Sequence, residues 1–270
     1  MPQADLPKIG LGTYSDDNRD QWTQNVTTAL DVGYRHIDTA QVYGNEEYVG
    51  QGIRESSVDR DEIFLATKTV HHDVPENPET VDEAIDGCLD RLGVDYVDLL
   101  YVHWPSGIYD HETVLPQFQE AYDEGKTRNI GLSNFTPQLL EEATDVLDAP
   151  VLACQVERHP LLQQDELIEY TKNNDIWLVS YTPLGKGAVF DDPVIQEIAA
   201  KHDITPAQVC LAWNIAEDHV AAIPKASSEG HMRDNLAALD IELDAEDLAT
   251  IDSIDREHRV IDPGHGPWNW

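Results

Sequence analysis

The fold is decided by a stretch in which two apolar runs flank one amphipathic segment. The first run reads Ile63-Phe64-Leu65-Ala66-Thr67-Lys68, and the second reads Val97-Asp98-Leu99-Leu100-Tyr101-Val102-His103. Between them, apolar residues recur at steps of three and four, the period of an amphipathic helix: Val81, Ala84, Ile85, Cys88, Leu89 and Leu92. Short apolar runs that alternate with helices are typical of parallel strands joined by helical crossovers. The stretch therefore predicts one β-α-β unit.

The same alternation continues along the whole chain. Eight sustained repeats predict an α/β fold in which a parallel sheet closes into a (β/α)8 TIM barrel, with residues 1–270 forming a single domain. An open doubly wound sheet is the alternative, but its G-x-G-x-x-G turn is absent, and Gly10-Leu11-Gly12-Thr13 is too short to supply it. Helix starts are expected at Asn45 and at Thr136-Pro137. The expected strands are Ile9–Thr13, Arg35–Asp38, Ile63–Lys68, Val97–His103, Ile130–Ser133, Val151–Gln155, Trp177–Tyr181 and Val220–Lys225.

The charge balance is strongly acidic, with 52 Asp and Glu against 17 Lys and Arg. These acids are scattered through periodic helices, so we expect them to coat a folded surface rather than a disordered tail. Such a surface repels itself in dilute buffer and is screened in concentrated salt. We therefore expect a halophilic protein from a salt-rich cytoplasm. No basic patch is available to meet phosphates, which argues against a nucleic-acid partner.

The cellular location is inferred from the ends of the chain and from its thiols. No opening segment pairs basic residues with a long apolar run, and no apolar stretch is long enough to cross a bilayer, so we expect neither a signal peptide nor a membrane partner. The three cysteines, Cys88, Cys154 and Cys210, show no metal-binding spacing. We expect them to be buried, reduced thiols of a cytoplasmic protein.

Polar residues stand at the carboxyl end of every expected strand. On a barrel these ends converge at one mouth, where the active site of such folds lies. A carboxylate, an ammonium group, an imidazole and phenols gathered there indicate an enzyme. The residues are Thr13, Asp38, Lys68, His103, Ser133, Asn134, Gln155, Tyr181 and Lys225.

Several of these residues lie in motifs that resemble the aldo-keto reductases, in the order found in that family. The resemblance covers the chain from about Gly10 onward. Within the family, the chain resembles the short-looped microbial members that reduce small aldehydes, ketones and keto-sugars. The motifs are Gly10-Leu11-Gly12-Thr13, Asp38-Thr39-Ala40-Gln41-Val42-Tyr43, Thr67-Lys68, His103-Trp104-Pro105, Gly131-Leu132-Ser133-Asn134-Phe135 and Ile223-Pro224-Lys225.

The resemblance implies a catalytic tetrad of Asp38, Tyr43, Lys68 and His103. A carbonyl group that accepts hydride develops alkoxide charge and needs a proton donor, which would be Tyr43. Because an ammonium group favours the phenolate form, we expect Lys68 to lower the pKa of Tyr43. Asp38 would keep Lys68 charged, and His103 would orient the carbonyl oxygen.

The resemblance also implies a nicotinamide cofactor, because no side chain can supply hydride. Ala226 and His231 stand where the family usually has a phosphate-binding Ser and an Arg. We expect NADP(H) on the family's prevailing use, and NAD(H) is compatible with these two replacements because His carries little charge at neutral pH. The expected cofactor-binding residues are Thr13, Ser133, Asn134, Gln155, Tyr181, Pro183, Leu184, Gly185, Lys225, Ser228, His231 and Asn235.

The substrate is expected to be a small-molecule carbonyl compound. We predict that Tyr14, Val42, Trp104 and the tail residue Trp268 form the pocket, since aromatic walls suit small apolar carbonyl compounds. Short loops after His103 and Tyr181 indicate an open pocket with loose selectivity. Short-looped members of the family are usually monomers, and we expect the same here.

Two other functions are compatible with parts of the sequence. The first is a metal-dependent barrel hydrolase that uses His36, His71, His72, His103 and Asp38, although adjacent His71 and His72 would point apart on an extended chain. The second is a non-catalytic module that binds the nicotinamide cofactor as a sensor. We expect no resident metal.

Overall fold

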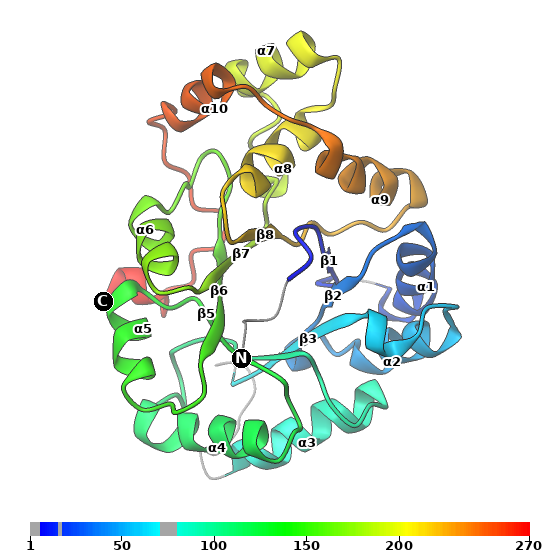
Figure 1. Cartoon of the computed structure of the whole chain (residues 1–270), viewed down its shortest axis with the longest axis vertical. Helices are drawn as coiled ribbons and strands as arrows, with labels where there is room; N and C mark the ends of the chain where they lie inside the picture. Colours follow the sequence, from blue (N-terminus) through cyan, green and yellow to red (C-terminus); the bar gives the residue numbers. More distant parts are fainter. Residues whose placement is uncertain (1–5, 16–17, 71–79) are drawn as a thin grey trace.

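The strands form one closed parallel barrel. The computed structural model describes residues 6–15, 18–70 and 80–270. The sheet runs in chain order from β1 to β8 (Figure 1). Hydrogen bonds from Gly10 N to Ala222 O (2.9 Å) and from Ala222 N to Lys8 O (2.8 Å) join the residues just before the first strand to the last strand. The predicted (β/α)8 barrel is therefore confirmed. The strands are β1 Leu11–Gly12, β2 His36–Asp38, β3 Phe64–Thr69, β4 Leu99–Val102, β5 Ile130–Ser133, β6 Val151–Glu157, β7 Trp177–Tyr181 and β8 Val220–Ala222.

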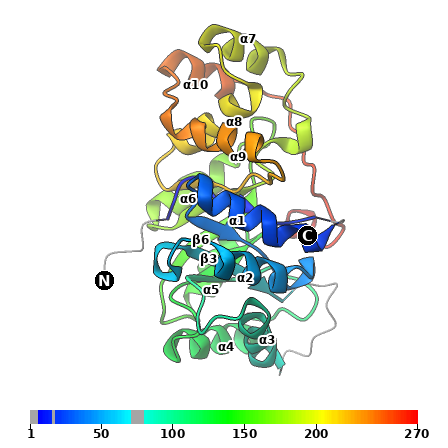
Figure 2. The same cartoon turned by 90° about the vertical axis from the view of Figure 1, so that its right-hand side faces the viewer.

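Helices surround this barrel in the described part of the chain (Figure 1). The connection from β7 to β8 holds two of them, and they form a separate small core with α10 at one end of the molecule (Figure 2). The Thr136 hydroxyl accepts a hydrogen bond from Leu139 N (3.3 Å) and begins α5 as predicted. The helices are α1 Trp22–Val32, α2 Glu46–Glu55, α3 Val81–Leu92, α4 His111–Asp123, α5 Pro137–Thr144, α6 Asp165–Asn173, α7 Pro193–His202, α8 Pro206–Ala216, α9 Glu229–Leu236 and α10 Ala245–Asp252.

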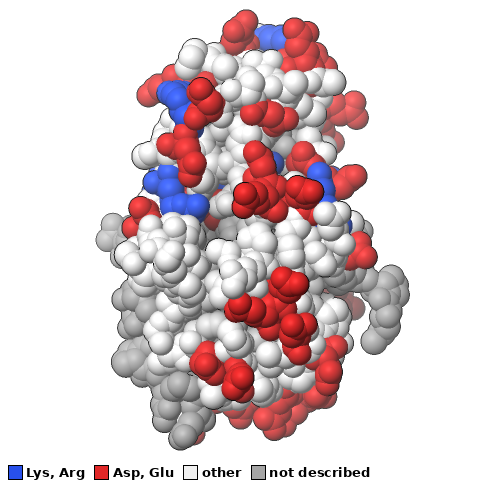
Figure 3. Space-filling view, turned by 90° about the vertical axis from the view of Figure 1, so that its left-hand side faces the viewer, with Lys and Arg blue, Asp and Glu red and all other residues white. Residues whose placement is uncertain are grey.

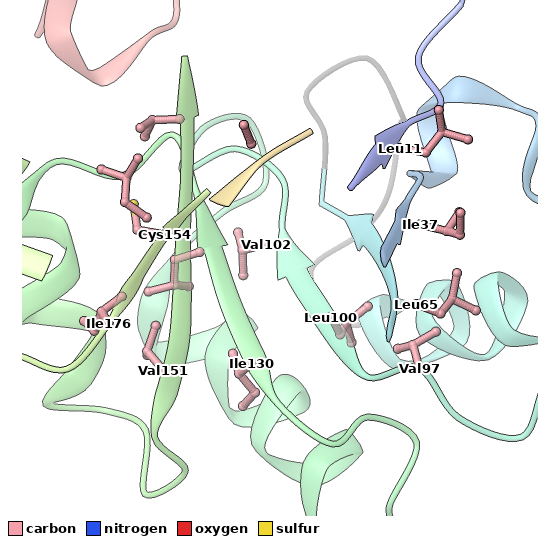
Figure 4. Packing of buried hydrophobic residues seen from close by; sticks show 14 of the residues in the cluster. Leu11, Ile37, Leu65, Val97, Leu100, Val102, Ile130, Val151, Cys154 and Ile176 are labelled. Atoms are coloured by element: carbon pink, nitrogen blue, oxygen red, sulfur yellow. The ribbon is translucent and has the colours of Figure 1, made fainter. Parts of the chain in front are cut away.

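Alternation along the strands separates two apolar layers. Leu65 and Leu100 face the helices and share the main core with residues such as Phe118 of α4 (Figure 4). Their neighbours Ala66 and Tyr101 belong to a second cluster that fills the barrel. Because side chains alternate with a period of two, residues of inward parity further along each strand reach the mouth of the barrel.

Two glycines allow the close approaches that closure requires. A Cβ atom on Gly12 would lie 2.6 Å from Ile223 O, where β1 meets the chain after β8. A Cβ atom on Gly131 would lie 2.5 Å from the Tyr101 ring, which occupies the barrel interior. Glycine at these positions therefore leaves room for the neighbouring strand and for the tyrosine ring.

Acidic side chains are prominent on one face of the molecule (Figure 3). Figure 3 shows Asp and Glu side chains spread over one face, with Lys and Arg confined to a few places. The three cysteines are buried, as predicted, and no disulfide joins them. Across residues 6–15, 18–70 and 80–270, none of the helices combines the length and apolar character of a membrane span.

Candidate active site

A buried ion pair lies at the carboxyl ends of β2 and β3. Lys68 Nζ donates hydrogen bonds to Asp38 Oδ1 and to Thr39 O, the latter at 2.8 Å. The second carboxylate oxygen of Asp38 accepts from Gln155 Nε2 of β6 at 2.8 Å. Lys68 is 0% exposed and Asp38 is 1% exposed. Because two opposite charges are removed from water together, each stabilises the other, and loss of one partner would leave an unpaired buried charge.

Tyr43 and His103 complete the predicted tetrad. Tyr43 lies on the short 3-10 helix Gln41–Tyr43, with its ring centre 5.3 Å from Lys68 Nζ. The ring centre of His103, which follows β4, lies 5.8 Å from that of Tyr43 at an interplanar angle of 80°. The four residues come from three strand ends and one loop, and the fold gathers them at a single place.

The expected effect of Lys68 on Tyr43 does not appear. Burial raises the pKa of the Tyr43 phenol well above its usual range, and the negative charge of Asp38 raises that pKa further. The Lys68 ammonium group is directed at Asp38 and at a backbone carbonyl, so the carboxylate offsets its charge at the phenol. Burial lowers the pKa of Lys68 itself, and Asp38 opposes that shift. The prediction of a lowered Tyr43 pKa is therefore wrong for this structure.

Asn45 fixes the loop that carries Tyr43. It precedes α2 as predicted, yet its side chain does not cap that helix. Instead Asn45 Oδ1 accepts from Thr39 Oγ1 (2.9 Å), and Asn45 Nδ2 donates to Thr13 O (2.8 Å). This buried amide ties the ends of β1 and β2 to the loop, and Gly44 ends the 3-10 helix with φ of 60°.

The residues expected around the nicotinamide form one hydrogen-bonded group. Asn134 Nδ2 donates to His103 O (2.9 Å) and to Ser133 Oγ (3.1 Å). Tyr181 Oη donates to Asn134 Oδ1 at 2.8 Å, while Ser133 Oγ donates to the backbone oxygen of Gln155 at 3.0 Å. The structure thus brings these four side chains together beside the Asp38–Lys68 pair.

A nicotinamide group fits this part of the mouth. The Thr13 side chain is 0% exposed, and its Oγ1 finds no hydrogen-bond partner among the described residues. A buried hydroxyl without a partner costs about 1–3 kcal/mol, so such groups are typical of sites completed by a ligand. The polar cluster of Ser133 and Asn134 adds amide and hydroxyl groups of the kind that a carboxamide needs.

The remaining expected cofactor residues occupy two further segments. Pro183, Leu184 and Gly185 follow β7, where Gly185 turns the chain with φ of 52°. The second segment follows β8: Lys225 is exposed, and Ser228 caps α9 by accepting from His231 N at 3.3 Å. In the same segment Ala226 and Asn235 are buried, whereas His231 is exposed.

The expected substrate residues lie in two groups. The Tyr14 ring centre is 5.2 Å from that of Tyr43, and the half-buried Val42 is its chain neighbour. On the other side, the ring centres of Trp104 and Trp268 are 5.7 Å apart. The tail residue is therefore beside Trp104, the residue that follows His103.

Three residues near the mouth escaped the sequence analysis. Tyr101 lies inside the barrel two residues before His103, and its ring centre is 5.8 Å from Lys68 Nζ. Glu157 extends β6 two residues beyond the expected end, and His265 packs its ring 5.1 Å from that of Trp104. The two-residue parity with His103 and Gln155 is a signal that could have identified Tyr101 and Glu157.

Among the described residues, the structure does not assemble the metal ligands expected for the hydrolase alternative. His71 and His72 lie outside the described residues, and His36 is buried beside Phe64. In the described ranges, the one group with metal-ligand spacing is His202, Asp244 and Asp247, between α7 and α10. Lys201 Nζ already bonds Asp244 (2.8 Å) and Asp247 (2.7 Å) there.

Comparisons with known proteins identify the family of the chain. The sequence model of the Aldo/keto reductase family matches residues 8–256. A glyoxal reductase of Bacillus subtilis (strain 168) is 39% identical over 257 residues, which cover 95% of this chain and 92% of the relative. The methylglyoxal reductase DkgB of Escherichia coli O157:H7 is 39% identical over 263 residues, which cover 96% of each protein.

The solved structures give the same result. An aldo-keto reductase from a Medee basin deep-sea metagenome library matches with a TM-score of 0.89 and 35% identity, covering 96% of this chain and 95% of that one. These comparisons give no support to a non-catalytic module. Family match, relatives and fold together show that this chain belongs to the aldo/keto reductase family and is an NAD(P)-dependent oxidoreductase.

Proposed function

We propose that this enzyme reduces small aldehydes, above all 2-oxoaldehydes, with NADPH, and that Tyr43 donates the proton. The observation that carries the proposal is the buried Asp38–Lys68 pair beneath the Tyr43 ring, next to His103. The names of the two relatives, a glyoxal reductase and a methylglyoxal reductase, support this substrate class. Ketones and keto-sugars are the other carbonyl compounds that the family reduces.

The side chains divide the work at the carbonyl oxygen. Thr13, Ser133, Asn134, Gln155 and Tyr181 would hold the nicotinamide group of the cofactor, which would supply the hydride when bound. The raised pKa of Tyr43 keeps the phenol protonated at neutral pH, the form that donates a proton in reduction.

The other three residues of the tetrad support that transfer. His103 donates a hydrogen bond to the carbonyl oxygen and directs it toward the phenol. Lys68 lies against the Tyr43 ring, and Asp38 holds Lys68 in place.

The proton-donor role is tested by Tyr43→Phe. We expect kcat for methylglyoxal to fall by about 10²–10⁴-fold, the range for loss of a general acid, while the Kd for NADPH stays within about twofold. Steady-state absorbance at 340 nm measures kcat, and stopped-flow measurements of NADPH binding give the Kd. Normal turnover by this variant would remove Tyr43 from the mechanism.

Val42→Ala, one residue earlier on the same 3-10 helix, is the matched control. It changes the expected pocket wall and leaves the phenol in place. We expect it to alter KM more than kcat, because wall contacts contribute to binding in the ground state as well as in the transition state.

We propose NADP(H) as the preferred cofactor. Lys225 is exposed in the segment after β8, where it can meet a 2′-phosphate, whereas the nearby Arg233 is paired with Glu229 at 2.8 Å. The exposed His231 lacks the permanent charge and bidentate fork of the Arg that the family usually has here, so NAD(H) remains compatible with the site.

The cofactor preference is tested with His231→Arg, which adds a permanent charge and a bidentate donor. We expect it to raise kcat/KM for NADPH by about 10-fold with little change for NADH. The comparison is made at high KCl with both cofactors. A wild-type preference for NADH above about 10-fold would reverse this assignment.

We also propose that the protein works as a single-domain monomer in a salt-rich cytoplasm. The excess of 52 acidic over 17 basic residues supports the salt adaptation, as do the acidic side chains spread over the face drawn in Figure 3. The monomer follows the usual state of short-looped family members.

A further inference from the structure

The carboxyl-terminal segment, residues 254–270, descends from α10 along one side of the molecule to the C-terminus (Figure 2). Within the described residues its regular structure is the short 3-10 helix Pro267–Asn269. A hollow of about 500 Å³ is lined by part of the segment together with residues 135–137 and 160–167. The segment is therefore held by particular contacts rather than by continuous packing.

Glu157 provides the most buried of these contacts. Its side chain is 0% exposed at the end of β6. Glu157 Oε1 accepts a hydrogen bond from Val260 N (2.6 Å), and Oε2 accepts from Ile261 N (2.7 Å). A single carboxylate thus binds two successive backbone amides of the segment, an arrangement that fixes both its position and its direction.

His159 completes the surroundings of this carboxylate. Leu161 N donates to His159 Nδ1 at 3.3 Å, which makes Nδ1 the acceptor and assigns the proton to Nε2. His159 Nε2 then donates to Glu157 Oε1 at 2.9 Å. The backbone nearby adds a contact from His258 N to Leu161 O at 2.7 Å.

Glu157 with Val260 and Ile261 forms an anchor for the segment. From this anchor the segment continues to the expected wall of the carbonyl pocket. Arg259 lies over the Trp268 ring at 3.9 Å, and Trp268 Nε1 donates to Asp262 Oδ1 at 2.9 Å. These contacts place Trp268 and His265 against Trp104, with ring centres at 5.7 and 5.1 Å. The wall therefore depends on where residues 259–262 are held.

We propose that Glu157 is a positioning residue that acts through the carboxyl-terminal segment: by binding Val260 and Ile261 it sets the aromatic wall and so selects carbonyl substrates with a bulky apolar group. This inference rests on the proposed function, because the wall matters only if a carbonyl compound binds beside it. A substrate with an aromatic group contacts the wall, whereas one with a methyl group is too small to do so.

Glu157→Gln tests the proposal with nearly unchanged shape. In the variant one acceptor oxygen becomes an NH2 group, which faces a donor whichever way the amide is turned. We expect KM for phenylglyoxal to rise about 10-fold while kcat stays within about twofold, and KM for methylglyoxal and Kd for NADPH to change less than about twofold. The exposed Glu169→Gln on α6 is the matched control and should behave like the wild type.

A double-mutant cycle with Trp268→Ala shows whether Glu157 acts through the wall. Trp268→Ala alone should also raise KM for phenylglyoxal, but in the Glu157→Gln background it should add less than about twofold. Amide hydrogen exchange supplies a readout that does not need activity: Val260 and Ile261 should exchange faster in Glu157→Gln and at the wild-type rate in Glu169→Gln.

The outcomes separate this proposal from the proposed function. If wild-type enzyme reduces neither 2-oxoaldehyde, the proposed function fails, and the exchange measurement still tests the anchor. If the wild type is active and Glu157→Gln keeps its KM for phenylglyoxal, the positioning role is wrong. Independent, multiplicative effects of the two substitutions, or equal losses with both substrates, would likewise overturn it.

Discussion

Lys68 has no exposed side-chain surface, yet its amino group is paired with the likewise buried Asp38. Its position follows from inward parity on β3, and its partner Asp38 ends the neighbouring strand in register with Ala66. The inward position of Lys68 and the strand-end position of Asp38 were predictable, because the sequence shows how side chains alternate along each strand. The pKa of Tyr43 was not, because it reflects how burial and the Asp38 charge combine around one phenol.

A second buried titratable residue, His36, makes stability depend on pH. Burial lowers the pKa of His36 to about 4, below its ordinary value of 6.5. As the solution is acidified, the His36 imidazole therefore takes up a proton in the unfolded chain at a higher pH than in the folded protein. The stabilising contribution is complete above about pH 6.5 and is lost as the pH falls toward 4, which amounts to about 2 kcal/mol between pH 7 and pH 5.

His36→Met isolates this contribution, because Met does not titrate. We expect the difference in the free energy of unfolding between wild type and variant to change by about 2 kcal/mol from pH 7 to pH 5, measured by urea denaturation. His258→Met at an exposed position is the control and should show no such change. A parallel pH dependence of wild type and His36→Met would contradict the assignment.

At the scale of the element, β5 is shaped by Gly131. Gly131 pairs with Tyr101 of β4 and with Ala153 of β6, and a Cβ atom there would meet the Tyr101 ring at 2.5 Å. We expect Gly131→Ala to lower the free energy of unfolding by about 1–3 kcal/mol, because the barrel interior has no space for the methyl group.

Gly230→Ala is the matched control for this substitution. Gly230 lies in α9, and nothing stands within 4 Å of the added Cβ atom. We expect it to stabilise the protein by about 0.4–1 kcal/mol, because alanine restricts the unfolded chain. Equal effects of the two substitutions in chemical denaturation would show that contact with Tyr101 does not limit β5.

The strand boundaries show how far periodicity reaches at this scale. All eight strands lie inside or overlap the expected runs, because apolar alternation defines them locally. Their ends differ: β8 stops at Ala222, whereas β6 continues to Glu157. A strand ends where its neighbour stops offering backbone partners, and that depends on the register of the closed sheet.

At the scale of the whole molecule, the net charge of −35 should make folding depend on salt. The Debye length falls from about 10 Å at 0.1 M salt to about 3 Å at 1 M, so repulsion between acidic side chains is screened. We expect the thermal midpoint to rise by at least about 5 °C over this range of KCl, equivalent to about 1–3 kcal/mol in a large domain.

Sucrose is the control for the salt experiment, since it favours the compact state without screening charge. At equal osmolarity we expect it to raise the midpoint much less than KCl does. A midpoint that does not respond to KCl, or that responds equally to sucrose, would argue against electrostatic adaptation.

The sequence by itself determined the barrel and the family to which the chain belongs, because period and motif order are properties of the chain. Only the tertiary structure decided which groups share a hydrogen bond or a charge. In the structure, Asn45 bonds to the ends of β1 and β2 instead of capping α2, and burial raises the pKa of Tyr43. Glu157 binds the backbone of residues about a hundred positions later. Such effects depend on distances between segments remote in sequence, which local patterns do not contain.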